Sequence, residues 1–251
     1  MRVTPSGAPS PADLAVLRRL SEDELHPVGQ FAAASNATLL CRLGDDGVMA
    51  VYKPERGEAP LWDFPQRTLH RREVAAYVID RALGWGMVPP TVLREQAPYG
   101  RGSVQLFVEH DPDQHYFALM EEPLPEIDEQ LRRMVLFDIV VNNADRKGSH
   151  VLLDAAGRIH LVDHGVCFHV EPKLRTVAWD FVGQPTPVAA REEVGQLAAR
   201  LADPADTAAA QLALLLTPDE VVATAARAAA VARLERFPAP TGERPFPWPP
   251  L

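Results

Sequence analysis

Residues 142–165 read NNADRKGSHVLLDAAGRIHLVDHG. Two short apolar runs flank the turn-forming residues 154–157, which is typical of a β-hairpin. Antiparallel pairing across this turn would bring His150 and Asp163 to the same end of the hairpin, a few steps of about 3.3 Å apart. Asp145 comes shortly before that end. The stretch therefore predicts two carboxylates and an imidazole beside one loop.

Such a cluster is costly unless a cation lies within it, because like charges at close range oppose ionisation. Lys147 in the same loop supplies one positive charge. Hard carboxylate oxygens favour Mg²⁺ or Mn²⁺, held jointly with phosphate oxygens. The stretch thus predicts a divalent cation beside the cluster of Asp145, His150 and Asp163.

The sequence before this stretch predicts strands that carry one helix. A hairpin is expected over 37–53, ending at Lys53, and a further strand over 102–108. Apolar residues at helical spacing predict a helix over 69–83, and Glu73 lies on it. A lysine on a strand and a glutamate on a helix can form an ion pair that orients the ammonium group.

The sequence after residue 110 is mainly helical in pattern. Helices are expected over 126–141 and in the Ala-rich segments 189–203 and 205–235. The many prolines of 237–251 predict an irregular, disordered tail. At the other end, residues 1–12 are rich in Pro, Ser and Gly and are expected to be disordered, with a short helix then running to residue 19.

Composition narrows the classes of protein and of partner. With 251 residues, 47% apolar and 24% charged, the chain is expected to be a folded globular protein. Its formal charge of -9 disfavours nucleic acid and anionic membranes as partners, and no apolar run is long enough for stable membrane insertion. Cys41 and Cys167 lie far apart, which fits free thiols in the cytoplasm.

The order lysine, glutamate, polar loop with aspartate, hairpin and second aspartate is that of the kinase template. In these residues the chain resembles the phosphatidylinositol 3-/4-kinase-like family, whose catalytic loop reads Asp-Arg with an Asn five places after the Asp, and whose metal motif is D-x-G. The matching residues are Asp145-Arg146, His150 and Asp163-His164-Gly165. The likeness is greatest to the family's small actinobacterial branch and spans residues 28–183, through VYKP (51–54), REVAAY (72–77), VPP (88–90) and WDF (179–181).

This resemblance implies an ATP-dependent phosphotransferase. By analogy, Asp145 would accept or orient the proton of the acceptor hydroxyl, and Lys147 would stabilise the transferred charge. Asp163 and His150 would hold Mg²⁺ or Mn²⁺. Because His150 replaces the usual Asn, the metal preference would move toward Mn²⁺ or Zn²⁺.

The resemblance also implies an α+β, two-lobed, protein-kinase-like fold. A strand-rich, nucleotide-binding N-lobe is expected at 13–110 and a mainly helical C-lobe, carrying the catalytic and metal residues, at 111–236. ATP would lie between them, with residues 105–110 as the hinge that meets adenine. The residues expected to bind the nucleotide are Lys53, Glu73, Ser35, Asn36, Phe107, Val108 and Glu109. The sequence has no G-x-G-x-x-G loop here, and a polar turn that contains Ser35 and Asn36 takes its place.

Several alternatives remain open on the sequence alone. The chain could be a nucleotide-binding pseudokinase or regulatory scaffold with little transfer activity. His160 and His164 have the i, i+4 spacing of a zinc hydrolase, although that spacing requires a helix where a strand is predicted. The acceptor could be a protein, a small molecule or a lipid headgroup, and the transferred group could be nucleotidyl. Trp179 and Asp180 could lie near the acceptor or cap a helix.

Overall fold

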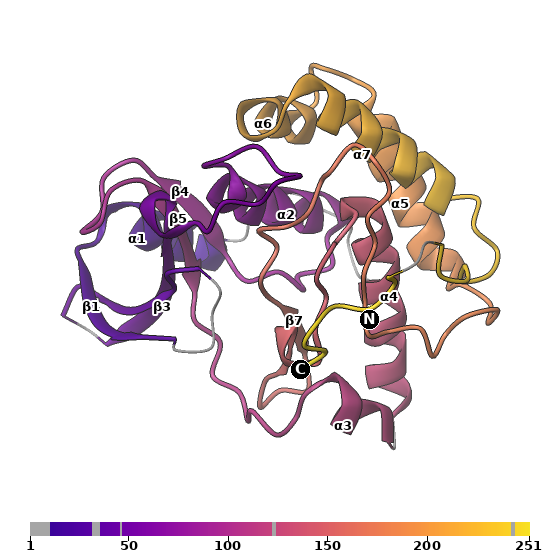
Figure 1. Ribbon diagram of the computed structural model, residues 1–251, viewed down its shortest axis with the longest axis horizontal. Helices are drawn as coiled ribbons and strands as arrows, with labels where there is room; N and C mark the ends of the chain where they lie inside the picture. Colours follow the sequence, from indigo (N-terminus) through magenta and orange to yellow (C-terminus); the bar gives the residue numbers. More distant parts are fainter. Residues whose placement is uncertain (1–10, 32–35, 46, 122–123, 242–243) are drawn as a thin grey trace.

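The chain folds into a strand-rich lobe and a mainly helical lobe, which lie side by side in Figure 1. The structure, a computed structural model, describes residues 11–31, 36–45, 47–121, 124–241 and 244–251. The elements in chain order are α1 (Pro11–Glu22), β1 (Leu25–Gln30), β2 (Leu39–Leu43), β3 (Val48–Pro54), η1 (Glu55–Gly57), α2 (Leu69–Leu83), β4 (Thr91–Arg94), β5 (Gly102–Leu106), α3 (Tyr116–Glu121), α4 (Pro125–Val141), η2 (Gly148–His150), β6 (Val151–Leu153), β7 (Ile159–Leu161), α5 (Val188–Leu201), α6 (Thr207–Leu215) and α7 (Pro218–Val231).

An antiparallel five-stranded sheet forms the strand-rich lobe, in the order β1-β2-β3-β5-β4. Lys53 pairs with Ser103, and Pro54 pairs with Gly102. A Cβ on Gly102 would lie 2.4 Å from the main-chain oxygen of Lys53. Only glycine therefore permits this close pairing, which fixes the end of β3 that carries the lysine.

Helix α1 packs on the sheet and completes the core of this lobe. It starts at Pro11 and ends at Glu22, so the prediction of disorder was wrong for residues 11–12, and the helix is longer than predicted. Residues 1–10 lie outside the described part of the chain. The core consists of Leu20, Leu25, Cys41, Leu43, Ala50, Tyr52 and Val104.

Helix α2 has the bounds that the apolar spacing predicts, and it ends at Gly84 in the left-handed conformation (φ 73°). It lies between the sheet and the other helices in Figure 1, and both of its sides are buried. Its Arg72 donates to the main-chain oxygen of Cys167 (2.6 Å) and to Glu220 on α7 (2.5 Å). This buried ion pair ties α2 to the helical lobe.

The helical lobe is built around α4, α5 and α7, with the hairpin β6–β7 beside them. The single helical segment expected over 205–235 is two helices. Thr217 and Glu220 form a capping box and Pro218 takes the first turn, so a new helix starts there. None of the helices in the described residues is long and apolar enough to cross a bilayer.

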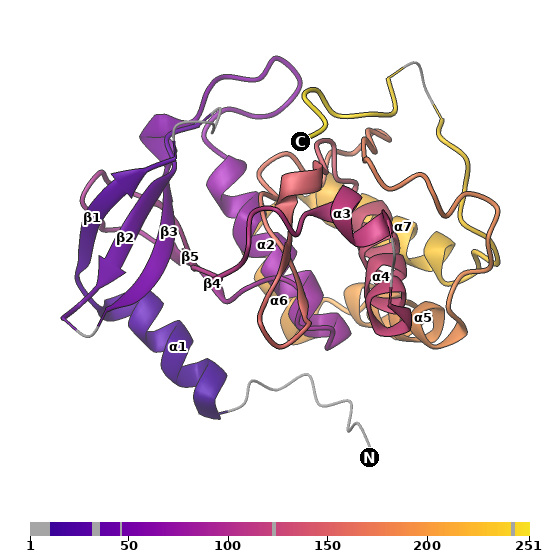
Figure 2. The same ribbon diagram turned by 90° about the horizontal axis from the view of Figure 1, so that it is seen from below.

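The described part of the tail, 238–241 and 244–251, contains no helix or strand, as the prolines predict. It is nevertheless fixed to the helical lobe by main-chain hydrogen bonds, so the prediction of a disordered tail was wrong for these residues. In Figure 2 the yellow tail runs back across the helical lobe, and Figure 1 shows its end beside β7.

Candidate active site

Three charged side chains from three separate elements meet between the lobes. Lys53 on β3 places its Nζ 2.5 Å from Oε1 of Glu73 on α2 and 2.9 Å from Oδ1 of Asp163, which follows β7. Glu73 is 3% exposed and Lys53 21% exposed, whereas Asp163 is 48% exposed. The lysine and glutamate are therefore buried under an aspartate that still faces solvent.

The segment Asp163–Gly165 is anchored to α2 by its main chain. The N–H of His164 donates to Oε2 of Glu73 at 3.0 Å. A Cβ on Gly165 would lie 3.4 Å from Cβ of Leu69, in ordinary van der Waals contact, so this segment packs directly against α2. Asp163 itself has φ +60°, a strained conformation for a non-glycine residue that costs on the order of 1–3 kcal/mol. Such strain is maintained only where the surroundings fix the backbone.

Lys53 and Asp163 favour each other's charged forms, whereas burial raises the pKa of Glu73 although Lys53 lowers it in part. Burial disfavours the charge on Lys53, but Asp163 and Glu73 raise the pKa of its ammonium group above the ordinary value. Burial also opposes ionisation of Asp163, but the Lys53 ammonium holds the pKa of the Asp163 carboxyl below its usual range. Lys53 and Asp163 are therefore both charged at neutral pH.

Asp145 and Lys147 lie together in the loop after α4. Nζ of Lys147 is 3.4 Å from Oδ2 of Asp145. The side chain of Asn143 fixes the loop by accepting from the N–H of Asp145 at 2.9 Å. Burial raises the pKa of Asp145 to about 6, although Lys147 lowers it in part. A carboxylate with a pKa near the working pH suits proton transfer.

His150 and Asp163 meet at the end of the hairpin, as the pairing predicts. Nε2 of His150 is 3.3 Å from Oδ2 of Asp163, and the N–H of Val162 donates to the His150 carbonyl. Burial lowers the pKa of His150 to about 4, so the ring is neutral at neutral pH. Its Nδ1 accepts from the N–H of Lys147 at 3.4 Å, which assigns the ring proton to Nε2. Binding of a metal through Nε2 would require that proton to move to Nδ1.

The donor set fits a divalent cation that is shared with a ligand. Among the residues that the structure describes, no group of three or more His, Cys, Asp or Glu could hold a metal. Asp163 and His150 supply one carboxylate and one imidazole, so phosphate oxygens or water would have to complete the coordination.

Arg146, which belongs to the Asp-Arg motif but received no role from the sequence, holds the site together. It is fully buried and pairs with Asp138 on α4 through two bonds of 2.9 Å. It also donates to the carbonyls of His150 (3.2 Å) and Val162 (3.0 Å), and so links helix, loop and hairpin. The sequence signal that points to Arg146 is its partner Asp138, a charged residue at a buried position of the helix expected over 126–141.

Asn36 and residues 107–109, which are also expected to bind the nucleotide, lie outside helices and strands. Ser35 lies outside the described residues. Oδ1 of Asn36 accepts from the N–H of Ala59 at 2.7 Å, so this amide already has a loop partner. Phe107, Val108 and Glu109 follow β5 in a connector without helix or strand that leads toward the helical lobe.

Two alternative assignments do not agree with the geometry. Asp180 caps no helix, since α5 starts only at Val188; its carboxylate accepts from the hydroxyl of Tyr116 at 2.7 Å. Nε2 of His160 contacts Asp154, whereas Nε2 of His164 contacts the Arg146 guanidinium, so the two rings do not share a zinc site.

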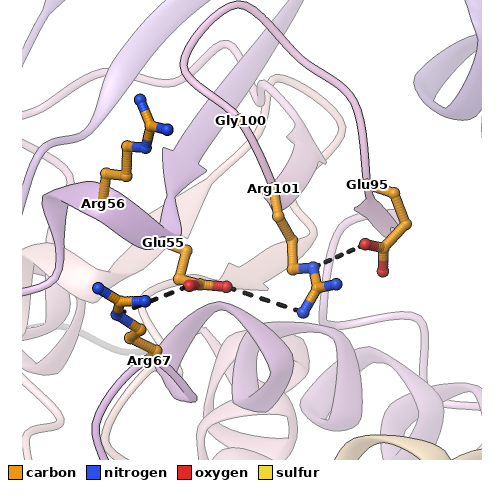
Figure 3. Close-up of a pocket in the computed structure, with 6 residues that line it drawn as sticks. All are labelled: Glu55, Arg56, Arg67, Glu95, Gly100 and Arg101. Carbon is orange, nitrogen blue, oxygen red and sulfur yellow. Dashed lines mark hydrogen bonds and ion pairs between the residues drawn. The ribbon is translucent and has the colours of Figure 1, made fainter.

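A cavity of about 480 Å³ lies elsewhere, at the end of β3 and the β4–β5 turn (Figure 3). Glu55 stands between Arg67 and Arg101, with its oxygens 3.9 Å from a nitrogen of each. Arg101 also pairs with Glu95 at 2.6 Å. None of the residues of the candidate active site lines this cavity, so the cavity is separate from that site.

Comparison with known proteins identifies one relative over nearly the whole chain. No family model matches the sequence. Protein Rv2133c of Mycobacterium tuberculosis is 39% identical over an alignment of 267 positions, which covers 92% of this chain and 93% of that protein. Phosphatidylinositol 4-kinase gamma 4 of Oryza sativa subsp. japonica is 30% identical over 126 residues, which are 43% of this chain but only 22% of the plant protein.

Solved structures share the fold at low sequence identity. The Golgi casein kinase with Mn/ADP bound has a TM-score of 0.57 and 13% identity, covering 90% of this chain and 76% of that one. Hydra Fam20, in a structure with sugar, has a TM-score of 0.58 and 15% identity, covering 90% and 89%. The predicted α+β, two-lobed kinase-like fold is thereby confirmed. The chain thus belongs to the family of Protein Rv2133c and has a kinase-like fold.

Proposed function

We propose that the protein is an ATP-dependent phosphotransferase that acts on a hydroxyl group. The convergence of Lys53, Glu73 and Asp163 from three elements, in a chain with a kinase-like fold, is the observation that carries this proposal. A buried ammonium group held between two carboxylates is positioned to neutralise nucleotide phosphates at the cleft. Asp145 and Lys147 lie in the adjoining loop, as the template requires.

In the proposed step Asp145 accepts the proton of the acceptor hydroxyl. The hydroxyl oxygen forms a bond to the γ-phosphorus of ATP, while the bond from that phosphorus to the β–γ bridging oxygen breaks and ADP leaves with the electron pair. Lys147 stabilises the negative charge on the transferred group. The pKa of about 6 leaves Asp145 ionised, and thus able to accept the proton, at neutral pH.

Asp163 and His150 are the proposed ligands of Mg²⁺ or Mn²⁺. A divalent cation at this position would supply Lewis-acid stabilisation of phosphate charge. The imidazole favours Mn²⁺ over Mg²⁺, which agrees with the Mn/ADP bound to the structurally similar Golgi casein kinase. Ser35, Asn36 and the connector 107–109 are the proposed contacts of the nucleotide.

The plant lipid kinases support descent from a common kinase domain, and we extend the proposal to kinship with the phosphatidylinositol 3-/4-kinase-like family on that ground. The match covers about a fifth of the Oryza sativa protein and of its Arabidopsis thaliana counterpart, also named phosphatidylinositol 4-kinase gamma 4, so their acceptor is not assigned to this chain. The two cysteines are free and buried, which supports the cytoplasm as the proposed setting.

The variant Asp145→Asn tests the proposal. Turnover of ATP, with water as the acceptor, should fall by about a hundredfold or more, because the general base is lost. ATP affinity should stay within about twofold, because Lys53 and Asp163 are untouched. Asp113→Asn, an exposed carboxylate on the connector before α3, is the matched control and should behave as wild type.

Undiminished turnover in Asp145→Asn would remove the proposed role of this residue. ATP binding without turnover in the wild-type chain would instead identify a pseudokinase.

A further inference from the structure

Residues 244–251, RPFPWPPL, lie against the proposed catalytic loop. The main-chain oxygen of Pro250 accepts from the N–H of Gly148 at 2.8 Å. Gly148 directly follows Lys147 and lies three residues after Asp145. Figure 1 shows the end of the yellow tail beside β7, the second strand of the hairpin that follows this loop. The tail therefore reaches the loop that carries the groups proposed for transfer.

A second contact fixes the tail to the segment that follows Asp163. The main-chain oxygen of Pro245 accepts from the N–H of Thr176 at 3.0 Å and from Nε1 of Trp179 at 3.1 Å. Thr176 in turn bridges to Arg146 of the catalytic loop. The N–H groups of Gly148 and Thr176 and the indole of Trp179 thus lie on two neighbouring segments. Each of them donates to a main-chain carbonyl of the tail.

This pattern is suited to an extended peptide. Proline restricts φ and removes the main-chain donor, so a proline-rich segment presents carbonyl acceptors at a small entropic cost. A peptide with such carbonyls satisfies the N–H groups of Gly148 and Thr176. A lipid headgroup or a sugar offers hydroxyls but no row of carbonyls at peptide spacing.

The tail is an unreactive occupant of this position. Residues 244–251 contain no Ser, Thr or Tyr, so they offer no hydroxyl to phosphorylate. Most of their side chains face solvent rather than the lobe; Phe246 is 55%, Trp248 89% and Leu251 53% exposed. The described contacts are therefore mainly main-chain hydrogen bonds, which a competing peptide can replace.

We propose that the surface formed by Gly148, Thr176 and Trp179 binds an extended, proline-containing polypeptide whose hydroxyl is the acceptor, and that residues 244–251 occupy this surface until the acceptor displaces them. This inference rests on the proposed phosphotransferase function and names the substrate class, a protein Ser, Thr or Tyr. The transfer step is the one given above, with the acceptor oxygen on the bound peptide.

Peptide binding to two full-length chains tests the inference. One is wild type, and in the other residues 244–251 are replaced by a Gly-Ala repeat of equal length. The probe is the fluorescently labelled peptide RPFPWPPL, and its binding is measured by anisotropy. The Gly-Ala repeat keeps the main-chain carbonyls but loses the restricted φ of the four prolines, each worth a factor of roughly two to five, so it should occupy the site less. The replaced chain should therefore bind the peptide at least about tenfold more tightly than wild type.

Matched tryptophan variants of the replaced chain test whether the peptide binds at Trp179. Trp179→Phe removes the indole donor to Pro245 and should weaken peptide binding by roughly two- to tenfold. Trp85→Phe removes an indole donor that bonds Glu193 instead, and should leave peptide affinity unchanged. The peptide RPFPSPPL, which carries a serine, should then accept phosphate from ATP.

The inference is overturned if the replaced chain binds ATP but not the peptide, or if both chains bind the peptide equally well. Phosphate transfer to phosphatidylinositol vesicles but not to the serine peptide would also overturn it. A different result, the absence of ATP binding in both chains, would contradict the proposed function itself.

Discussion

Asp145 and Asp163 are two carboxylates of one site whose pKa values move in opposite directions. Partial burial opposes ionisation of Asp163, but its contact with the Lys53 ammonium group holds the pKa low. Partial burial raises the pKa of Asp145 to about 6; Lys147 lowers it in part, and the neighbouring Asp163 raises it. Opposite shifts separate a carboxylate that stays charged from one that can exchange a proton. The geometry thus supports different roles for the two residues.

The pH dependence of turnover tests the role of Asp145. Its carboxylate must be ionised to accept a proton, so the rate should fall as pH decreases through about 6. Lys147 lowers this pKa, and the neighbouring Asp163 raises it. Lys147→Met should therefore move the acidic limb of the profile to higher pH, by up to roughly one unit.

Lys173→Met is the matched control, because Lys173 contacts Asp63 and Trp62 instead. An acidic limb that stays in place in Lys147→Met would show that Asp145 does not set it.

The sequence predicted which charged residues converge, but not all of their partners. His150 and Asp163 follow from hairpin pairing, and Lys53 with Glu73 follows from the kinase order. The hydrogen bond from the N–H of Ala59 to the side chain of Asn36 could not be predicted, because it joins two loops that have no repeating pattern. The same holds for the contact between Asp180 and Tyr116.

At the scale of elements, the pairing of β3 with β5 positions the site lysine. Lys53 lies opposite Ser103, and β5 comes close because Gly102 has no side chain. A Cβ there would also lie 2.7 Å from the Tyr52 ring and 2.9 Å from Cα of Pro54. Relief of this overlap requires movement of the backbone, not of a flexible side chain.

Gly102→Ala should therefore lower the free energy of unfolding by about 1–3 kcal/mol and weaken ATP binding, since β3 must shift. Gly29→Ala on β1 is the control, because a Cβ there meets nothing within 4 Å, and it should change stability by less than about 0.5 kcal/mol. Urea denaturation and ATP titration measure both effects. Equal stability of the two variants would contradict this account of the pairing.

Elements with strong local signals were predicted, whereas those without such signals were not. Helix α2 has apolar spacing and a glycine stop, so its bounds were found. Strand β1 contains Pro27 and Gly29, and β4 has only four residues, so neither has a clear alternation. The Ala-rich segment after residue 205 is helix-forming throughout, and only the capping box at Thr217 divides it.

At the scale of the whole molecule, α2 couples the two lobes. Its Glu73 faces Lys53 of the sheet, and its Arg72 bonds Cys167 and Glu220 of the helical lobe. The site therefore exists only when sheet, α2 and hairpin are all in place. No local sequence pattern specifies this assembly, which explains why the fold followed from the kinase order and not from composition.

The central claim is that ATP binds between the lobes with a metal ion at Asp163. Calorimetry of ATP binding with Mn²⁺, with Mg²⁺ and with neither tests it most directly, with wild type, Asp163→Asn and the control Asp113→Asn side by side. We predict metal-dependent binding to wild type and to Asp113→Asn, weakened by roughly tenfold or more in Asp163→Asn. Binding that is independent of metal and unchanged in Asp163→Asn, or no binding under any condition, would contradict the account.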